Sequence, residues 1–351
     1  MRNIAAPPLD HLLALSDDTG VIQHATHDIP NRSTGYCSDD VSRAFMVVLA
    51  KLELDPRNET AAKLASVYLA FLHDAQMEDG WFHNFMSFDR RWLDDRGTED
   101  SFGRTVWSLG FGMRYGNRES WKTVCGRLLE NAIPRFGDLR YLRSIAYAVI
   151  GISHAFASGS ADEAMCRETV RPLADALKTA YLANRDTGWQ WFENEMTYDN
   201  ARLCEAVLRA GLLLRDDELI AVGLRTFAFY ERTVMEDGMF IPIGNNGWYV
   251  RGGRRARYGQ QPLEVASMVD AALIAHDCTG DPAFVATARL AFEWFYGKNT
   301  SGVQMVDRGG CCDGIDAGGA NPNMGAESTL AYLASACALA DRPAKALTIA
   351  R

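Results

Sequence analysis

The chain has 351 residues and a net charge of −9, with 48% apolar and 23% charged residues. This composition is typical of a soluble globular protein with a sizeable core, and the acidic balance without a basic stripe argues against a nucleic-acid partner. No apolar run is long enough to span a membrane or to act as a signal peptide. Eight cysteines without CxxC spacing indicate a reducing compartment, so we expect a cytoplasmic protein.

A short helix is predicted over residues 9–16, and a polar loop follows at 23–34. From there one unit repeats six times: a polar loop with acidic residues leads into an apolar helix, and an amphipathic helix follows. The apolar helices are predicted at 39–52, 99–113, 139–156, 198–213, 262–276 and 326–340. The amphipathic helices are predicted at 59–76, 119–132, 162–183, 217–233 and 282–296, with a partial sixth after Asp341.

The two kinds of helix predict two layers. A helix that is apolar nearly all round is buried on both sides, whereas an amphipathic helix faces solvent. The chain leaves each apolar helix through a short turn and returns through long loops at 77–98, 184–197, 235–260 and 297–325, with one short return near 134–138. We therefore expect an all-α (α/α)6 toroid as a single domain over residues 1–351. Its long loops would form one mouth, and its N-terminal helix would complete the last pair.

The starts of the apolar helices carry acidic residues, and the long loops carry aromatic residues. Paired carboxylates across a pocket cleave glycosidic bonds, and aromatic faces pack against sugar rings. A single acid at a helix start is more often a cap, but acids from six loops at one face favour a functional role. The catalytic candidates are Asp40, Asp100, Glu264 and Glu327. The candidates for substrate binding are Tyr36, Asp39, Trp81, His83, Glu99, Arg104, Trp189, Glu193, Tyr198, Asp199, Trp248 and Asn323.

The repeat also makes a geometric prediction. At least two of the carboxyl groups at 40, 100, 199, 264 and 327 should face one pocket, flanked by Trp81, Trp189 or Trp248. At least one of them should have a raised pKa, as a general acid requires. Pairing of all five acids with Arg43, Arg104 and Arg202, with none at a cavity, would remove the basis for hydrolysis. Acids held on different helices favour an inverting over a retaining reaction.

No motif for a metal or a nucleotide cofactor is present. The sequence has no HExxH, no P-loop and no Rossmann glycine pattern. The segment 307–323 is rich in oxygen donors but lacks EF-hand spacing, which favours an ordinary structured loop. We expect neither a metal nor a cofactor.

Several motifs together resemble a bacterial family of six-hairpin glycosidase-like proteins. These are Gln23-His24-Ala25, Pro30-Asn31-Arg32, Gly35-Tyr36-Cys37-Ser38-Asp39-Asp40, Asp79-Gly80-Trp81-Phe82-His83-Asn84-Phe85-Met86, Glu99-Asp100-Ser101, Tyr198-Asp199-Asn200-Ala201-Arg202 and Gly325-Ala326-Glu327-Ser328-Thr329. Such modules are often found beside or fused to glycosyltransferases. The resemblance implies the (α/α)6 fold, a carbohydrate context and a possible glycosyltransferase partner, but no assigned acid and base.

Three functions remain open at this point. The leading hypothesis is a glycoside hydrolase that acts on a neutral oligosaccharide or polysaccharide through paired carboxylates. The second is a sugar isomerase, epimerase or lyase, for which His24, His27, His83 or Tyr198 would have to act as the base. The third is a non-catalytic glycan-binding partner of a glycosyltransferase. The sequence names neither the sugar nor its anomer.

Overall fold

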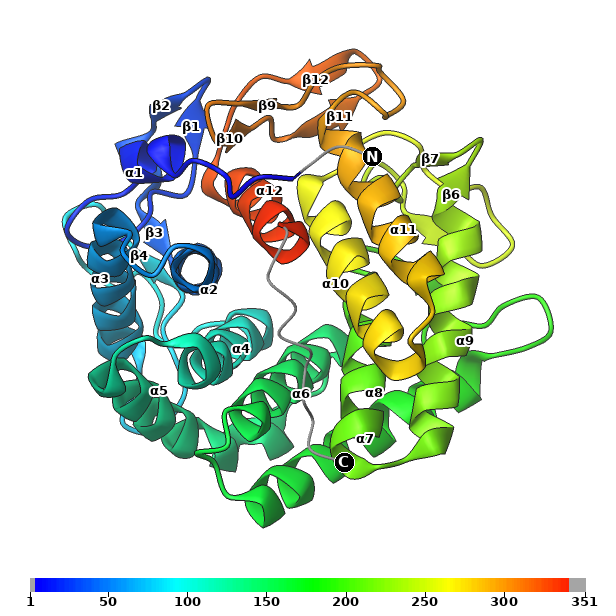
Figure 1. The fold of residues 1–351 in the computed structure, drawn as a ribbon, viewed down its shortest axis with the longest axis horizontal. Helices are drawn as coiled ribbons and strands as arrows, with labels where there is room; N and C mark the ends of the chain where they lie inside the picture. The colour runs from blue at the N-terminus through cyan, green and yellow to red at the C-terminus, as the bar shows by residue number, and fades with distance from the viewer. Residues whose placement is uncertain (1–3, 341–351) are drawn as a thin grey trace.

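The computed structural model describes residues 4–340, and its inner layer is a closed ring of six helices (Figure 1). Each inner helix packs against the next around the ring, and the last packs against the first. The chain is thus an (α/α)6 toroid, as predicted. The inner helices are α2 (Ser38–Leu54), α4 (Glu99–Tyr115), α6 (Leu142–Ala157), α8 (Ala201–Leu214), α10 (Pro262–Thr279) and α12 (Ala326–Leu339).

The outer layer follows the predicted amphipathic helices. Each outer helix lies outside the ring, next to an inner one (Figure 1). The short helix α1 (Asp10–Leu15) contacts α12, where a sixth outer helix would otherwise stand. The partial sixth helix predicted after Asp341 lies outside the described residues. The outer helices are α3 (Glu59–Ala75), α5 (Glu119–Ala132), α7 (Glu163–Asn184), α9 (Asp217–Val234) and α11 (Pro282–Phe292).

Three helix boundaries differ from the prediction for local reasons. The helix predicted from 139 begins at Leu142, because the chain before it forms the 3-10 helix η2 (Ile133–Asp138). The helix predicted from 198 begins at Ala201, because Asp199 has a left-handed backbone (φ 49°) that cannot continue a helix. The last turn predicted for 282–296 is replaced by the 3-10 helix η3 (Glu293–Phe295).

The long loops contain six small antiparallel hairpins or strand pairs. Two of these pairs join different loops: β3 pairs with β4, and β5 pairs with β8. The loops before α2 and α4 are therefore fastened together, as are the loops before α8 and α10, so the mouth is a connected layer. The strands are β1 (Ala25–Thr26), β2 (Ile29–Pro30), β3 (Tyr36–Cys37), β4 (Phe85–Met86), β5 (Glu195–Met196), β6 (Met235–Glu236), β7 (Met239–Phe240), β8 (Tyr249–Val250), β9 (Val306–Asp307), β10 (Gly310–Cys311), β11 (Gly314–Asp316) and β12 (Gly319–Asn321).

Helices α4 and α6 approach each other most closely through small residues. A Cβ atom on Gly110 would overlap the backbone of Gly151, and a Cβ on Gly103 would press against Ser144. Glycine at these points lets the two backbones pack directly, which narrows the ring on this side. Among the helices of residues 4–340, none combines the length and the apolar character that crossing a membrane requires.

Candidate functional site

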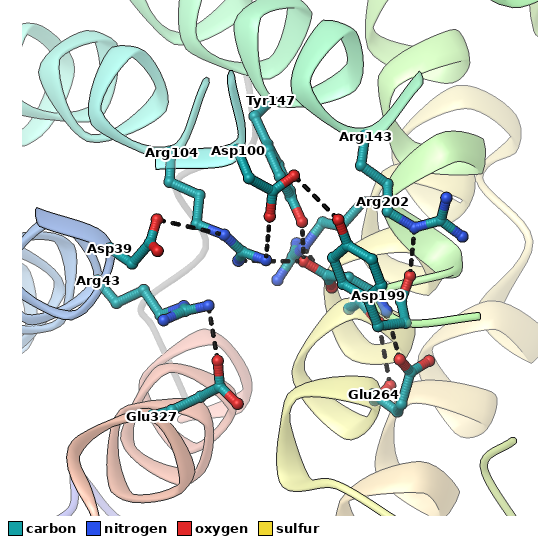
Figure 2. Close-up of polar contacts among 12 residues, drawn as sticks. Asp39, Arg43, Asp100, Arg104, Arg143, Tyr147, Asp199, Arg202, Glu264 and Glu327 are labelled. Atoms are coloured by element: carbon teal, nitrogen blue, oxygen red, sulfur yellow. Dashed lines mark hydrogen bonds and ion pairs between the residues drawn. The ribbon is translucent and has the colours of Figure 1, made fainter. Parts of the chain in front are cut away.

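Three arginines lie one helical turn inside the mouth, and we call Arg43, Arg104 and Arg202 the arginine layer. They come from α2, α4 and α8 and extend toward the centre of the ring (Figure 2). Each follows an acidic residue by three or four positions. For Asp40–Arg43 and Asp100–Arg104 this spacing places both side chains on the same face of a helix, whereas Asp199 lies just before α8. The face toward the axis is therefore charged, although these helices are otherwise apolar.

Arg104 joins carboxylates from three parts of the chain. Its guanidinium lies 3.3 Å from Oδ2 of Asp100, 3.3 Å from Oδ2 of Asp199 and 3.8 Å from Oδ1 of Asp39 (Figure 2). It also lies over the ring of Tyr147, with its carbon 4.4 Å from the ring centroid. A buried arginine is tolerated only with such partners, because desolvating an unpaired charge costs several kcal/mol, on the order of 3–5 when one partner is removed.

Arg43 links the opposite side of the opening. Its Nη1 donates to Asp40 at 2.9 Å and its Nη2 to Glu327 at 2.9 Å. The Glu327 side chain is 40% exposed, whereas that of Asp40 is 8% exposed. Figure 2 shows Asp39 beside Arg43 on one helix and directed toward Arg104, Asp100 near Arg104 on a second helix, and Glu327 on a third helix on the other side of Arg43. The mouth therefore presents accessible carboxylates on two sides of one space.

Asp199 is held in a strained position at the centre of the site. A positive φ in a residue other than glycine costs on the order of 1–3 kcal/mol and is often found at functional sites. Its Oδ2 accepts a 2.6 Å hydrogen bond from the Tyr147 hydroxyl, and Arg202 Nε lies 3.4 Å from its Oδ1. Burial alone would raise the pKa of Asp199, but the charges of Arg202 and Arg104 outweigh it and lower the pKa below its usual value.

Glu264 lies behind Asp199, and its side chain does not line the cavity described below. It accepts hydrogen bonds from the backbone N–H of Asp199, from both the backbone and the side-chain amide of Asn200 (3.4 and 3.3 Å), and from the Tyr230 hydroxyl (3.0 Å). Only 1% of the residue is exposed. Burial and the Asp199 charge raise the pKa of Glu264 to about 7. This predicted catalytic residue therefore fixes the Asp199 turn rather than facing the opening.

Asp39 contrasts with Asp199 in the direction of its pKa shift. Burial raises the pKa of Asp39, although Arg104 and Arg43 oppose the rise. Its Oδ1 accepts no hydrogen bond from the described residues, while its side chain keeps 24% of its surface exposed. Two carboxyl groups whose pKa values are pushed apart can divide the roles of proton donor and charged group. The site holds such a pair in Asp39 and Asp199.

A cavity of about 280 Å³ runs along the axis of the ring, and we call it the axial cavity. Asp199 and Glu327 both line it, so two of the five predicted carboxylates do face one cavity. The prediction for the flanking aromatics was wrong, because Trp107, Phe111 and Tyr115 of α4 line the axial cavity instead of the loop tryptophans.

The loop tryptophans stabilise the loops themselves. Trp81 is 3% exposed, stacks on Phe102 at 4.3 Å and donates to the Gly97 carbonyl at 2.8 Å. Trp189 is equally buried and donates to the Glu193 carbonyl at 2.7 Å. Trp248 packs against the core as part of its loop, with φ 53°.

Other predicted site residues lie outside the arginine layer. Asp40 is buried and accepts from the Cys37 thiol at 3.2 Å as well as from Arg43; burial raises the pKa of Asp40 to about 6. Tyr36 is buried and donates to Asp17 at 2.6 Å. Glu99 accepts from the backbone N–H groups of Arg140 and Tyr141, at 2.7 and 3.0 Å.

The remaining predicted residues form a rim around the site. Tyr198 donates to Oδ1 of Asp100 at 3.1 Å, and Glu193 accepts from Arg143 at 2.9 Å. His83 is tied to Asp94 and stacks on Trp92, with centroids 4.9 Å apart. The side-chain oxygen of Asn323 accepts from the His27 backbone at 2.9 Å, which joins two loops.

Sequence reasoning missed Tyr147, Glu205 and Asp270, and it named Arg43 and Arg202 only as ion-pair partners of the acids. Glu205 and Asp270 are charged residues in apolar helices buried on both sides, so their side chains must point to the axis. That rule, applied to every inner helix, would have found both of them and two of the arginines as well.

Comparisons with known proteins support the fold but no closer relationship. No family model matches the chain, and no curated protein matches its sequence. Three solved structures illustrate the likeness. Cellobiose 2-epimerase from Bacillus thermoamylovorans has a TM-score of 0.73 and 11% identity, with 95% of each chain covered. A D-mannose isomerase has a TM-score of 0.69 and 13% identity, with 94% of each chain covered. A GH76 α-mannanase from Bacteroides thetaiotaomicron has a TM-score of 0.64 and 10% identity, covering 94% of this chain and 93% of that one.

Proposed function

We propose that the protein is a carbohydrate-active enzyme, and specifically a glycoside hydrolase that works at the loop-bearing mouth. One observation carries this proposal: Asp39, Asp100 and Glu327 come from three different inner helices and keep partly exposed carboxylates around Arg43 and Arg104. Glycoside hydrolysis needs two carboxyl groups across one space. The fold of the chain, shared with sugar-processing enzymes, agrees with this chemistry.

The proposed roles follow from charge and position. Asp39, whose raised pKa favours the protonated form, is the proton donor to the leaving oxygen, and Asp100 supports it through the shared Arg104. Glu327, across the opening, is the base that activates water. Because donor and base belong to different helices, we propose inversion at the anomeric carbon, which requires a carboxyl separation of about 6.5–9.5 Å. Asp199 remains ionised and stabilises positive charge that develops on the sugar.

Epimerisation or isomerisation is the second candidate, because two of the three neighbours described above are named for these reactions. Such a reaction needs a base that removes a proton next to a carbonyl. Desolvation raises the pKa of both Tyr147 and Tyr198, so these phenols stay protonated. The base would then have to be one of the histidines named from the sequence, His24, His27 or His83, or a carboxylate. A third candidate is a glycan-binding partner of a glycosyltransferase, which would bind without turnover.

One experiment separates the three candidates. Purified protein is incubated with a panel of neutral oligosaccharides that includes cello- and manno-oligosaccharides, in D₂O. A new reducing end, formed with an inverted anomeric signal in ¹H NMR, supports hydrolysis. Deuterium at a sugar carbon without a new reducing end supports epimerisation. Saturable binding by calorimetry, with the sugar recovered intact after long incubation, supports the non-catalytic role.

A further inference from the structure

The axial cavity extends well below the arginine layer. Helix α4 lines it with Arg104, Trp107, Phe111 and Tyr115, which follow one another at successive turns. Eleven residues at about 1.5 Å per residue correspond to roughly 16 Å along the axis. The six inner helices close the ring sideways, so a chain-like ligand can enter this depth only along the axis.

The deep part of the cavity is polar and carries both signs of charge. Nη1 of Arg202 donates to Glu205 at 2.6 Å and to Asp270 at 2.7 Å, and Nε of Arg209 donates to Glu205 at 2.7 Å. These two arginines and two carboxylates, together with Asp277, lie on inner helices and line the cavity. A strongly charged ligand would meet like charge from part of this set, whereas a neutral polar ligand would meet both donors and acceptors.

Four buried polar atoms of residues that line the cavity have no hydrogen-bond partner among the described residues. Oδ1 of Asp199 and Nε of Arg202 form an ion pair with each other, which leaves Nδ1 of His154 and Nε1 of Trp107. His154 is 4% exposed and Trp107 is 8% exposed, and both residues line the axial cavity. Buried polar groups are nearly always satisfied in folded proteins, so each of these atoms requires a partner. Burial and nearby arginines lower the pKa of His154, and a neutral imidazole offers one donor and one acceptor.

Apolar and aromatic surface completes the wall. Phe111 and Tyr115 line the cavity below Trp107, whose ring is covered by the Arg202 guanidinium at 4.4 Å, and Leu273 and Ala334 lie on other helices around the same space. A sugar ring has a flat apolar face and hydroxyl groups that both donate and accept hydrogen bonds, and this wall offers contacts to both.

We propose that the deep part of the axial cavity binds the terminal ring of a neutral saccharide whose next bond lies at the arginine layer. The protein then acts from the ends of chains and not within them. This inference rests on the proposed hydrolase for its catalytic part, but the binding part stands without it. The whole axial cavity, with the arginine layer, has a volume of about 280 Å³, just under the range of about 300–1,000 Å³ for drug-sized ligands, so the part below the layer suits only the end of a chain.

The test fills the deep part without touching the mouth. Ala334→Phe places a ring in the cavity from α12, and Ala334→Ser is the control of nearly unchanged size. With a linear oligosaccharide that the protein cleaves, we expect the filled variant to lose at least tenfold in kcat/KM and the serine variant to stay near wild type. A cyclic oligosaccharide of the same linkage, which has no ends, should resist cleavage by the wild-type protein.

A second variant guards against misfolding of the first. His154→Phe keeps a planar ring of similar shape but removes both ring nitrogens, and we expect linear oligosaccharide to bind about tenfold more weakly by calorimetry, the loss of one hydrogen bond. If the cyclic substrate is cleaved as fast as the linear one, or if both variants keep wild-type affinity, the deep subsite is overturned while the hydrolase remains. If linear sugar binds without cleavage and Ala334→Phe or His154→Phe weakens this binding, the result supports the deep subsite and overturns the proposed hydrolase function. Absence of any binding across the panel overturns the subsite.

Discussion

The outer and inner helices differ in which groups accept hydrogen bonds from the free backbone N–H groups at their starts. Four outer helices carry an ordinary side-chain cap: Asn58, Asp162, Asp216 and Asp281 each accept a backbone N–H of the first turn. Among the six inner helices in residues 4–340, α4 alone has a side-chain cap at its own N-cap position, from Thr98. The amide groups of the inner starts must therefore be satisfied from elsewhere.

Acids from neighbouring segments accept hydrogen bonds from these backbone amide groups instead. Glu264 at the start of α10 binds the amides just before α8, and Glu99 at the start of α4 binds those just before α6. Asp313, from a loop, accepts from the backbone of Gly325 before α12. Within residues 4–340, five acids at or just before the inner starts accept no backbone hydrogen bond: Asp39, Asp40, Asp100, Asp199 and Glu327. Asp40 and Asp199 are only 5% and 2% exposed, so the partly exposed Asp39, Asp100 and Glu327 are the ones that can serve a reaction.

The largest effect is expected from replacing a partly exposed acid that accepts no hydrogen bond from the backbone. Asp39→Asn and Glu327→Gln should each lower kcat by about 10²–10⁴-fold on the substrate that the panel identifies, because general acid–base groups contribute that much. Asp100→Asn should also lower kcat, because Asp100 supports the proton donor Asp39 through Arg104. The melting temperature of each variant serves as the control for folding. Full turnover by all three variants would assign these acids to structure and remove the contrast with Glu99 and Glu264.

Stability should respond most to the arginine layer. Arg104→Met leaves Asp199 and its neighbours without their shared cation, so we expect a loss of about 3–5 kcal/mol in the free energy of unfolding. Arg90→Met is the matched control, since the Arg90–Asp18 pair is exposed and solvent already screens it. The check is urea unfolding of both variants. Equal effects of the two would mean that the buried cluster contributes no more than a surface pair.

The sequence predicted the ring because the pattern that encodes it is local. The chain itself shows the apolar periodicity, the short turns such as the one after α10, and the long loops that lead to the inner helices. From these features five pairs of inner and outer helices and the loop-bearing mouth were predicted. The boundaries missed at Leu142 and Ala201 depend on backbone conformations that no periodicity reports. Of the candidate acids, the sequence placed all at the mouth but could not tell Glu264, which binds backbone, from Glu327, which does not. That difference depends on which groups of a neighbouring helix lie next to each acid, and this is set by the tertiary structure.

The burial of Glu264 beside the Asp199 charge predicts a pH dependence of stability. Its pKa of about 7 in the folded protein lies above the ordinary value of 4.5, so between these pH values the folded state binds a proton that the unfolded state has lost. Stability from this group is therefore complete below pH 4.5 and is lost as the pH rises to about 7, by up to about 3 kcal/mol. Glu264→Gln should flatten this part of the stability curve, measured by urea unfolding at a series of pH values. The same slope in both proteins would contradict the assignment.

The smallest effect is expected from removing the side-chain cap of an outer helix. Asp162 caps α7 by accepting the backbone N–H of Met165 at 2.7 Å, a contact within one outer helix. Asp162→Ala should cost about 1 kcal/mol, the usual value of a single N-cap, and should leave turnover unchanged because α7 lies in the outer layer. Asp162→Asn, which keeps the acceptor oxygen, should restore most of that loss. Helix caps of the outer layer then act locally and independently, whereas a change in any acid or arginine of the inner layer reaches several helices at once. If Asp162→Ala lowered turnover as strongly as Asp100→Asn, the two layers would be coupled and this division would fail.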